Sequence, residues 1–331
     1  MPESTTDTHK SPLRYADVAV TYTADAFQGT YRGKKYHDPD FAHVLQRAKD
    51  HGVEKILLTT MSLPDAHKNL EIIRKFPEMC TMTLGVHPYH AGEIYTENDP
   101  DGKVYLDTLR TMGETLLAEE RSKSSYGAPL VAFGEIGLDY EYLERADKET
   151  QQRAFVDQLE IAMEMPTQLP LFLHVRSSCA DFIEIIKPFL PRLPQGKLGL
   201  VHSFAGSRSE MEQLISLGFE ISVNGVSFRT DEGLDMVRHL PLDRLQLETD
   251  APWCEVLGSD EKIAPFLRGV RELPPARKHG KFREGEMVKG RNESCTIERV
   301  AMVVAGLKGV EVEEVVRAAW ENSVRMFALG G

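Results

Sequence analysis

The sequence lacks the long apolar runs that would place it in a membrane. None of its hydrophobic stretches approaches the roughly 20 residues that a membrane-spanning helix needs. The first twelve residues, MPESTTDTHKSP, are polar and have no apolar core, so we expect no secretory signal. No arginine precedes Arg14, so a mitochondrial transit peptide is not expected either. We therefore expect a protein of the cytoplasm, the nucleus or both, with residues 1–12 disordered.

Cysteine is also scarce. The four cysteines are far apart and form no CxxC motif: Cys80, Cys179, Cys254 and Cys295. This spacing predicts free thiols in a reducing compartment.

Positive charge is in deficit as well. Lysine and arginine total 39 against 51 aspartates and glutamates, for a formal net charge of −12. Such a balance argues against a protein whose whole surface is basic for binding nucleic acid. The negative net charge is still compatible with a small basic groove beside a metal. It is equally compatible with an enzyme that acts on neutral or cationic small molecules.

What the sequence does contain is eight short apolar runs, most of them separated by helical patterns. Near-continuous runs of Val, Ile, Leu and Phe are typical of parallel strands that are buried on both faces. We expect strands at residues 15–22, 55–61, 80–86, 130–138, 169–175, 198–204, 219–225 and 245–251.

The stretches between these runs have helical spacing and recognisable ends. The segment DPDFAHVLQRAKDHG is expected to start with a capping aspartate and to end on Gly52. In the segment SRSEMEQLISLG, Ser207 is the expected cap and Gly218 the expected stop.

Eight strands alternating with helices predict either a (β/α)₈ barrel or a large doubly wound sheet. The number of strands favours the barrel, and so does the absence of a GxGxxG turn after the first strand. We therefore expect an α/β protein with a single TIM (β/α)₈ barrel domain over residues 13–331. Three segments that follow strands are longer than a minimal barrel needs, and we expect them to overhang its catalytic face: residues 24–40, 89–128 and 252–293.

Four polar residues stand towards the C-terminal ends of separate apolar runs: Glu135, His174, His202 and Asp250. Burying an unpaired carboxylate or imidazole is costly, so such groups are usually paired or bound to a metal. In a barrel they would lie at the ends of strands 4, 5, 6 and 8, where catalytic groups of this fold gather. One such histidine alone would more simply be a satisfied core residue, but four groups at matched strand ends predict one shared site.

Two imidazoles and two carboxylates suit Zn²⁺, Mn²⁺ or another divalent ion, and the oxygen ligands make Mg²⁺ plausible. Such an ion activates water and polarises a phosphoryl or carbonyl oxygen. We expect Asp250 to hold the metal and accept the proton of the attacking water, and Glu135 to bridge two ions. Glu248 shares the strand face of Asp250 and is expected to support it. Asp17, on the first strand, is a further candidate ligand.

Other residues at strand ends are candidates for contacting a substrate. His87 ends the third strand, and Arg176 points the same way as His174 and is suited to a phosphate. Tyr31, Tyr89 and Trp253 follow strands 1, 3 and 8, where they would either stack on unpaired bases or pack within the loops. A run of basic residues after strand 8 is a candidate grip for a polyanion, although such runs are usually solvated surface: Arg277, Lys278, Lys281, Arg283, Lys289 and Arg291.

Six motifs carry a family resemblance. In order and spacing, GVHP, GEIGLDY, LFLHVR, VHSFAG, ETDAPW and GRNES resemble the TatD family of metal-dependent deoxyribonucleases, from about Asp17 to Phe327. The segment TYRGKKYH is similar to its eukaryotic branch. The resemblance implies an amidohydrolase-like TIM barrel that hydrolyses phosphodiester bonds of DNA with Mg²⁺ or a similar ion. It also implies 3′-to-5′ exonuclease activity on single strands, in DNA repair or degradation.

The resemblance also implies roles for particular residues. It places metal ligands at Glu135, His174, His202 and Asp250, and a substrate contact at His87. Its GRNES loop corresponds to Arg291, Asn292 and Glu293 here, and we expect Arg291 and Asn292 to bind substrate.

One departure from the family pattern concerns the first strand. Many members have a His-x-His pair there, but this chain has Ala19 and Thr21 at those positions. A second ion would lack two imidazole ligands, so either one or two ions are expected.

Two other functions remain open from the sequence. A small-molecule amidohydrolase or lactonase would use the same ligands, but Glu135 stands where that superfamily often has a bridging lysine. The other function is that of a non-catalytic scaffold, a barrel that lost its activity together with the histidines of the first strand.

Overall fold

The computed structural model describes residues 13–123 and 128–330, so the segment expected to be disordered, residues 1–12, lies outside the described residues. Eight parallel strands form one sheet in chain order, β1-β4-β5-β6-β7-β8-β9-β10. Val20 of β1 bridges Ala251 beyond β10, and Thr21 N donates to Ala251 O at 2.8 Å, which brings the two edges together. The strands are β1 Tyr15–Val20, β4 Val53–Leu58, β5 Cys80–Leu84, β6 Leu130–Asp139, β7 Leu171–Arg176, β8 Gly199–His202, β9 Glu220–Val223 and β10 Leu245–Leu247.

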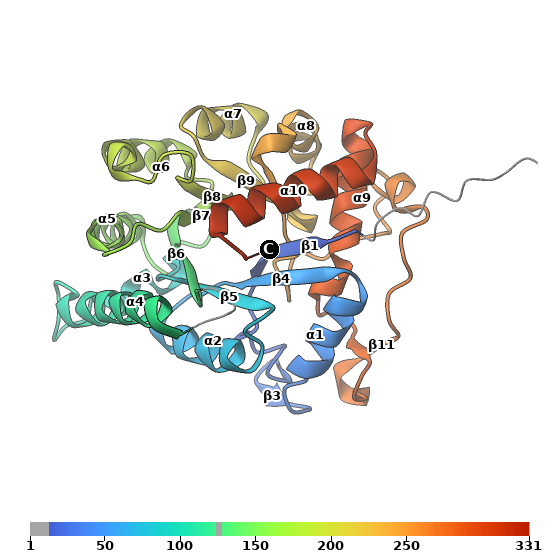
Figure 1. The fold of residues 1–331 in the computed structure, drawn as a ribbon, viewed down its shortest axis with the longest axis horizontal. Helices are drawn as coiled ribbons and strands as arrows, with labels where there is room; N and C mark the ends of the chain where they lie inside the picture. Colours follow the sequence, from blue (N-terminus) through green and yellow to red (C-terminus); the bar gives the residue numbers. More distant parts are fainter. Residues whose placement is uncertain (1–12, 124–127, 331) are drawn as a thin grey trace, which may run out of the picture.

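Helices surround this ring of strands (Figure 1). They are α1 Phe41–Asp50, α2 Leu63–Lys75, α3 Ala91–Ile94, α4 Lys103–Lys123, α5 Lys148–Glu164, α6 Cys179–Ile186, α7 Arg208–Ser216, α8 Asp231–His239, α9 Ile297–Lys308 and α10 Val312–Phe327. Short 3₁₀ turns are η1 Pro88–His90, η2 Lys187–Arg192, η3 Gly225–Phe228, η4 Leu242–Arg244, η5 Ala264–Leu267, η6 His279–Lys281 and η7 Ser294–Thr296. The predicted TIM barrel is confirmed, and each of the eight predicted strands overlaps an observed one.

The three long segments contain structure of their own. Residues 24–40 include an antiparallel hairpin of β2 Thr30–Tyr31 and β3 Lys34–Lys35. Residues 89–128 contain α3 and the 21-residue α4, which belongs to the ring of helices. Residues 252–293 hold η5, η6 and a second two-stranded pair, β11 Ala276–Arg277 and β12 Met287–Val288.

Of the two predicted helix caps, the structure confirms the one at α7 and corrects the one at α1. Ser207 caps α7, as expected, and the structure adds a full capping box in which Glu210 takes part. Asp40, the residue before α1, makes no capping hydrogen bond. Its carboxylate instead accepts hydrogen bonds from Arg47 and Arg291, because two buried guanidinium groups compete more strongly for it than a backbone amide does.

The interior of the barrel is closed at the end opposite the site. Phe327 and Leu329, at the end of α10 and just beyond it, pack with inward residues of the strands, among them Ala16 and Phe172. The chain just beyond α10 accordingly runs toward the centre of the ring in Figure 1. A ligand would therefore bind at the other end of the barrel, where the strands have their C-terminal ends; this end is called the mouth below.

Two further findings concern the described residues as a set. All four cysteines are free, as predicted. Among residues 13–123 and 128–330, no helix is long and apolar enough to span a bilayer.

Candidate metal centre

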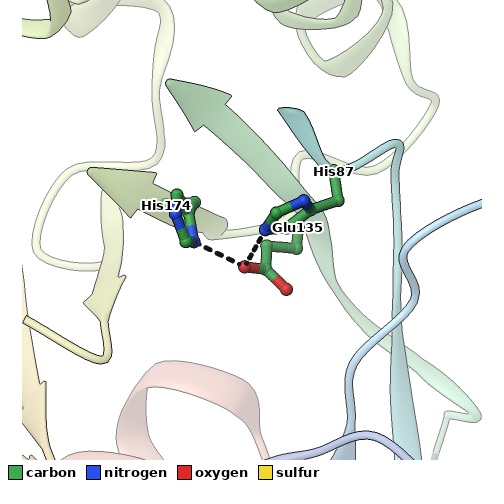
Figure 2. Close-up of side chains that lie close together, drawn as sticks. All are labelled: His87, Glu135 and His174. Carbon is green, nitrogen blue, oxygen red and sulfur yellow. Dashed lines mark hydrogen bonds and ion pairs between the residues drawn. The ribbon is translucent and has the colours of Figure 1, made fainter. Parts of the chain in front are cut away.

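Three imidazoles converge on one carboxylate oxygen in the barrel mouth. Glu135 Oε1 lies 2.9 Å from Nδ1 of His174, 2.5 Å from Nε2 of His202 and 3.2 Å from Nε2 of His87. His174 and His202 face each other across β7 and β8 as register partners. Figure 2 shows His87, just beyond β5, Glu135 of β6 and His174 of β7 pointing toward one another.

The chemistry of this cluster fits a bound cation. One carboxylate oxygen has two lone pairs, fewer than the three rings that approach it. His202 Nδ1 is buried without a hydrogen-bond partner, and its nearest carboxylate, Glu248 Oε1, is 3.6 Å away. Ligand atoms of His87, Glu135 and His174 lie within 4.8 Å of one another. A divalent ion at the centre would satisfy donors that the protein leaves crowded or unpaired.

The charges of the cluster are strongly coupled. Burial would raise the pKa of the Glu135 carboxyl, but the neighbouring imidazoles of His202, His87 and His174 bring it well below its usual range. Burial lowers the pKa of His87 to about 4, so this ring is neutral and able to offer a lone pair. A carboxylate beside a neutral imidazole is a donor pair that suits a metal.

Asp250 stands beside the cluster, three residues beyond β10. Its backbone φ is 50°, a left-handed conformation that is costly for a residue other than glycine and is often found at functional sites. Ser203 and Cys254 each donate to its Oδ2, at 3.4 and 3.1 Å. Burial raises the pKa of Asp250 to about 6, and the nearby carboxylates of Glu248 and Glu135 add to the effect against the opposing charge of His202. The structure therefore brings Asp250 to the same mouth as the other three expected ligands.

Asp139 holds His174 from the other side, and the sequence reasoning missed it. Its Oδ2 lies 2.8 Å from Nε2 of His174, and its side chain is fully buried. A carboxylate on the far nitrogen of a metal-binding histidine fixes the tautomer and the ring orientation. The available signal was its place four residues after Glu135, within the GEIGLDY motif.

Two buried glutamines of α5 hold the neighbouring strand ends. Gln158 bonds both the N–H and the C=O of Val86, at 2.7 and 3.1 Å, next to His87. Gln151 does the same for Asp139, at 2.8 Å in both directions. These contacts position two side chains of the cluster through their backbone.

Close approach of β5 and β6 requires a glycine beside the cluster. A Cβ on Gly85 would lie 2.6 Å from the carbonyl carbon of Gly134, the residue before Glu135. Any side chain at position 85 would push Glu135 away from β5 and so break its contact with His87.

Asp17 is buried but is not brought into the cluster. Its two carboxylate oxygens accept hydrogen bonds from N and Oγ1 of Thr249, at 2.8 and 2.6 Å. These bonds tie β1 to the turn that carries Asp250. The two positions that lack histidine are filled internally: Ala19 is buried, and Thr21 Oγ1 lies 2.5 Å from Thr59 Oγ1.

Arg176 lies at the edge of the mouth. Its side chain is 26% exposed, and its Nε is 3.6 Å from Glu141. Burial lowers the pKa of its guanidinium, but Asp139, Glu141 and Tyr89 outweigh this and raise it. The group is therefore charged and partly open, next to the Asp139–His174 pair.

Arg291 and Asn292 are not brought to the metal cluster. The side chain of Arg291 is fully buried and bonds Asp40 and Glu293. Asn292 donates to the carbonyl oxygens of Thr249 and Trp253, at 2.9 and 2.8 Å. Both side chains are used to hold loops, which sequence alone did not reveal because their partners are distant in the chain.

Comparisons with known proteins agree with this geometry. The family described as TatD related DNase matches residues 26–328. "Deoxyribonuclease Tat-D" of Schizosaccharomyces pombe is 38% identical over 316 residues, which cover 96% of each protein. "3'-5' ssDNA/RNA exonuclease TatD" of Erwinia tasmaniensis is 33% identical, over 95% of this chain and 99% of that protein.

Solved structures show the same relationship. A TatD-family hydrolase from Entamoeba histolytica superposes with a TM-score of 0.83 at 30% identity, covering 97% of this chain and all of that one. An uncharacterized amidohydrolase from Saccharomyces cerevisiae gives 0.85 at 30% identity, covering 96% and 100%. With motif, fold and near-complete coverage in agreement, the chain belongs to the TatD-related DNase family and is an enzyme of the hydrolase class.

Proposed function

We propose that this protein is a metal-dependent nuclease that hydrolyses phosphodiester bonds of DNA. The observation that carries the proposal is the convergence of three imidazole nitrogens on Glu135 Oε1, with Asp250 beside them, at the C-terminal ends of the barrel strands. The names of the relatives support a nucleic-acid substrate.

Glu135, His174, His202 and Asp250 would hold the cation, which we expect to be Mg²⁺, with Mn²⁺ or Zn²⁺ as alternatives. When bound, such an ion polarises a phosphoryl oxygen and makes water more acidic. His87 is placed to act as an additional ligand, since its Nε2 faces the same oxygen of Glu135. The imidazole of His87 would partly replace the two that the first strand lacks. The number of bound ions is therefore expected to be one or two.

The protein's own residues supply the remaining steps. Asp250 accepts the proton of the attacking water, and the hydrogen bonds from Ser203 and Cys254 fix its orientation. Arg176 contacts a nonbridging oxygen of the phosphate from the edge of the mouth, where its guanidinium matches that geometry. Asp139 keeps the His174 ring aligned.

We further propose 3′-to-5′ action on single-stranded ends, in DNA repair or degradation. The name of the Erwinia relative supports this polarity. Activity in the cytoplasm or the nucleus stays a prediction, to be tested by fractionation of cells that express the tagged protein.

The direct test uses end-labelled single-stranded DNA with Mg²⁺ or Mn²⁺. We expect nucleotides to be released from the 3′ end, and we expect Asp250→Asn to lower the rate by about 10²- to 10⁴-fold, the usual effect of losing a general base. Asp260→Asn, in the same long segment, is the matched control and should retain the wild-type rate. If the pure protein releases nothing, or if Asp250→Asn equals the wild type, the proposal is wrong; ester and lactone substrates in parallel would then identify a small-molecule hydrolase.

A further inference from the structure

A pocket of about 300 Å³ lies between the β2–β3 hairpin and the segment after β10. We propose that it binds one unpaired nucleobase of the DNA strand whose phosphate lies at the metal cluster. This inference rests on the proposed nuclease function and adds a substrate-binding site to it.

The pocket has aromatic walls. Tyr31, Trp253 and His279 line it together with Pro252. Trp253 is 48% exposed, although a tryptophan ring has a large apolar area that favours burial. A flat, exposed aromatic face next to a nucleic-acid site is a stacking platform for any of the four bases.

The charge of the pocket suits a base better than a phosphate. Its lining includes one guanidinium, Arg32, and one carboxylate, Asp25. A phosphate site would need an excess of positive charge or several backbone amides. An aromatic pocket in which one guanidinium and one carboxylate balance instead matches the face and polar edge of a nucleobase.

The pocket lies close to the reacting groups. Trp253 N donates to Asp250 O at 3.0 Å, which closes a tight turn and keeps the two Cα atoms within about 7 Å. A base held against Trp253 would therefore belong to a nucleotide next to the phosphate at Asp250.

Contacts within the protein hold two of the walls in place. The rings of Tyr31 and His279 stack on each other, with centroids 4.5 Å apart and an interplanar angle of 13°. Asn292 holds the carbonyl of Trp253 at 2.8 Å. Side chains held by such contacts lose little conformational entropy when a ligand binds, so their contacts with it contribute to affinity.

The test compares two hexanucleotides with the same backbone. Both carry hydrolysis-resistant phosphorothioate linkages; one is oligothymidine and the other is abasic at every position. Fluorescence anisotropy of a 5′ label, with Mg²⁺ present, gives the dissociation constants. We expect wild type to bind oligothymidine at least about 5-fold more tightly than the abasic strand.

Variants assign that preference to the pocket. Trp253→Ala should remove it, and Trp253→Phe should keep part of it because an aromatic face remains. Leu257→Ala is the matched control, since Leu257 is 50% exposed in the same segment and lies outside the pocket; it should keep the whole preference.

Tryptophan fluorescence provides a second readout. The chain has two tryptophans, so Trp320→Phe leaves Trp253 as the single reporter. Oligothymidine should quench it and the abasic strand should not. Equal binding of both strands by wild type, or an unchanged preference in Trp253→Ala, would overturn the inference.

Hydrolysis of an unmodified strand is measured separately. If wild type cleaves DNA but shows no base preference, the pocket inference is wrong and the nuclease proposal stands. If it binds bases through Trp253 but cleaves nothing, the pocket is right and the nuclease proposal is wrong.

Discussion

Asp139 illustrates how a residue acts on this site through another residue. It does not face Glu135 but lies 2.8 Å from the outer nitrogen of His174, and a guanidinium and a phenol, Arg176 and Tyr89, approach it from the rim. Burial raises the pKa of its carboxyl, but the hydrogen bond and charge of His174 outweigh this and lower it. The group is therefore ionised and keeps His174 in one orientation.

Asp139→Asn is predicted to weaken metal binding by about 10- to 100-fold, the usual effect of losing a carboxylate behind a metal-binding histidine. Calorimetric titration with Mn²⁺ measures this without an activity assay. Glu141→Gln, two residues later on the rim, is the control and should bind Mn²⁺ like wild type. An unchanged affinity in Asp139→Asn would show that His174 is oriented by other contacts.

At the scale of elements, a buried network of four charges joins α1 to the two long loops on either side of the pocket. Arg47 of α1 bonds Asp40 and Glu293, and Arg291 bonds the same two carboxylates. The two positive and two negative charges balance. Removing one carboxylate leaves a net positive charge in a buried place, which is costly.

The acid sensitivity of this network follows from Asp40. Burial alone would raise the pKa of Asp40, but the hydrogen bonds and charges of Arg291 and Arg47 bring it below its ordinary value. A carboxyl whose pKa is lowered by folding stabilises the protein above its unfolded pKa of about 4, and this stabilisation is lost as the pH falls through the folded pKa.

Asp40→Asn is therefore predicted to lower the free energy of unfolding by about 3–5 kcal/mol at pH 7. The difference from wild type should shrink as the pH falls below about 4 and disappear below the lowered pKa of the folded carboxyl, where the wild-type group is itself protonated. Denaturant unfolding at pH 7, 5, 4 and 3 measures both. Asp38→Asn, at an exposed position of the same loop, should differ little from wild type at every pH; a pH-independent difference for Asp40→Asn would contradict the linkage.

At the scale of the molecule, packed aromatic rings inside the barrel link the end that α10 closes to the metal cluster at the other end. Phe327 fills the closed end and lies 6.4 Å, ring to ring, from Phe172. Phe172 in turn stacks under His202 at 4.8 Å. The end of α10 thus packs against the ring that supports His202, one of the expected metal ligands.

Phe327→Ala is predicted to cost about 3–5 kcal/mol of stability, because the barrel cannot fully collapse around the lost ring. Thermal and denaturant unfolding measure the loss. Val104→Ala, at a highly exposed position of α4, is the control and should leave stability almost unchanged. A loss below about 1 kcal/mol for Phe327→Ala would mean that the interior does not depend on this ring.

The pattern of buried runs predicted the eight strands and the barrel because strand burial has a strong local signature in sequence. The same pattern predicted one shared mouth for Glu135, His174, His202 and Asp250, since parallel strands in a barrel end on the same side. Helix ends with local partners, such as Ser207 and Glu210, were predictable for the same reason.

Only the tertiary structure decided which partners the remaining polar groups have. Asp17, Asp40, Arg291 and Asn292 bond residues that are distant in the chain, and no spacing rule identifies such pairs. It also decided that His87 faces Glu135 and that Tyr31 and Trp253 share one pocket. Local sequence determines where a strand runs and which way a side chain points, whereas the contact that a side chain makes depends on the three-dimensional packing of loops far apart in the chain.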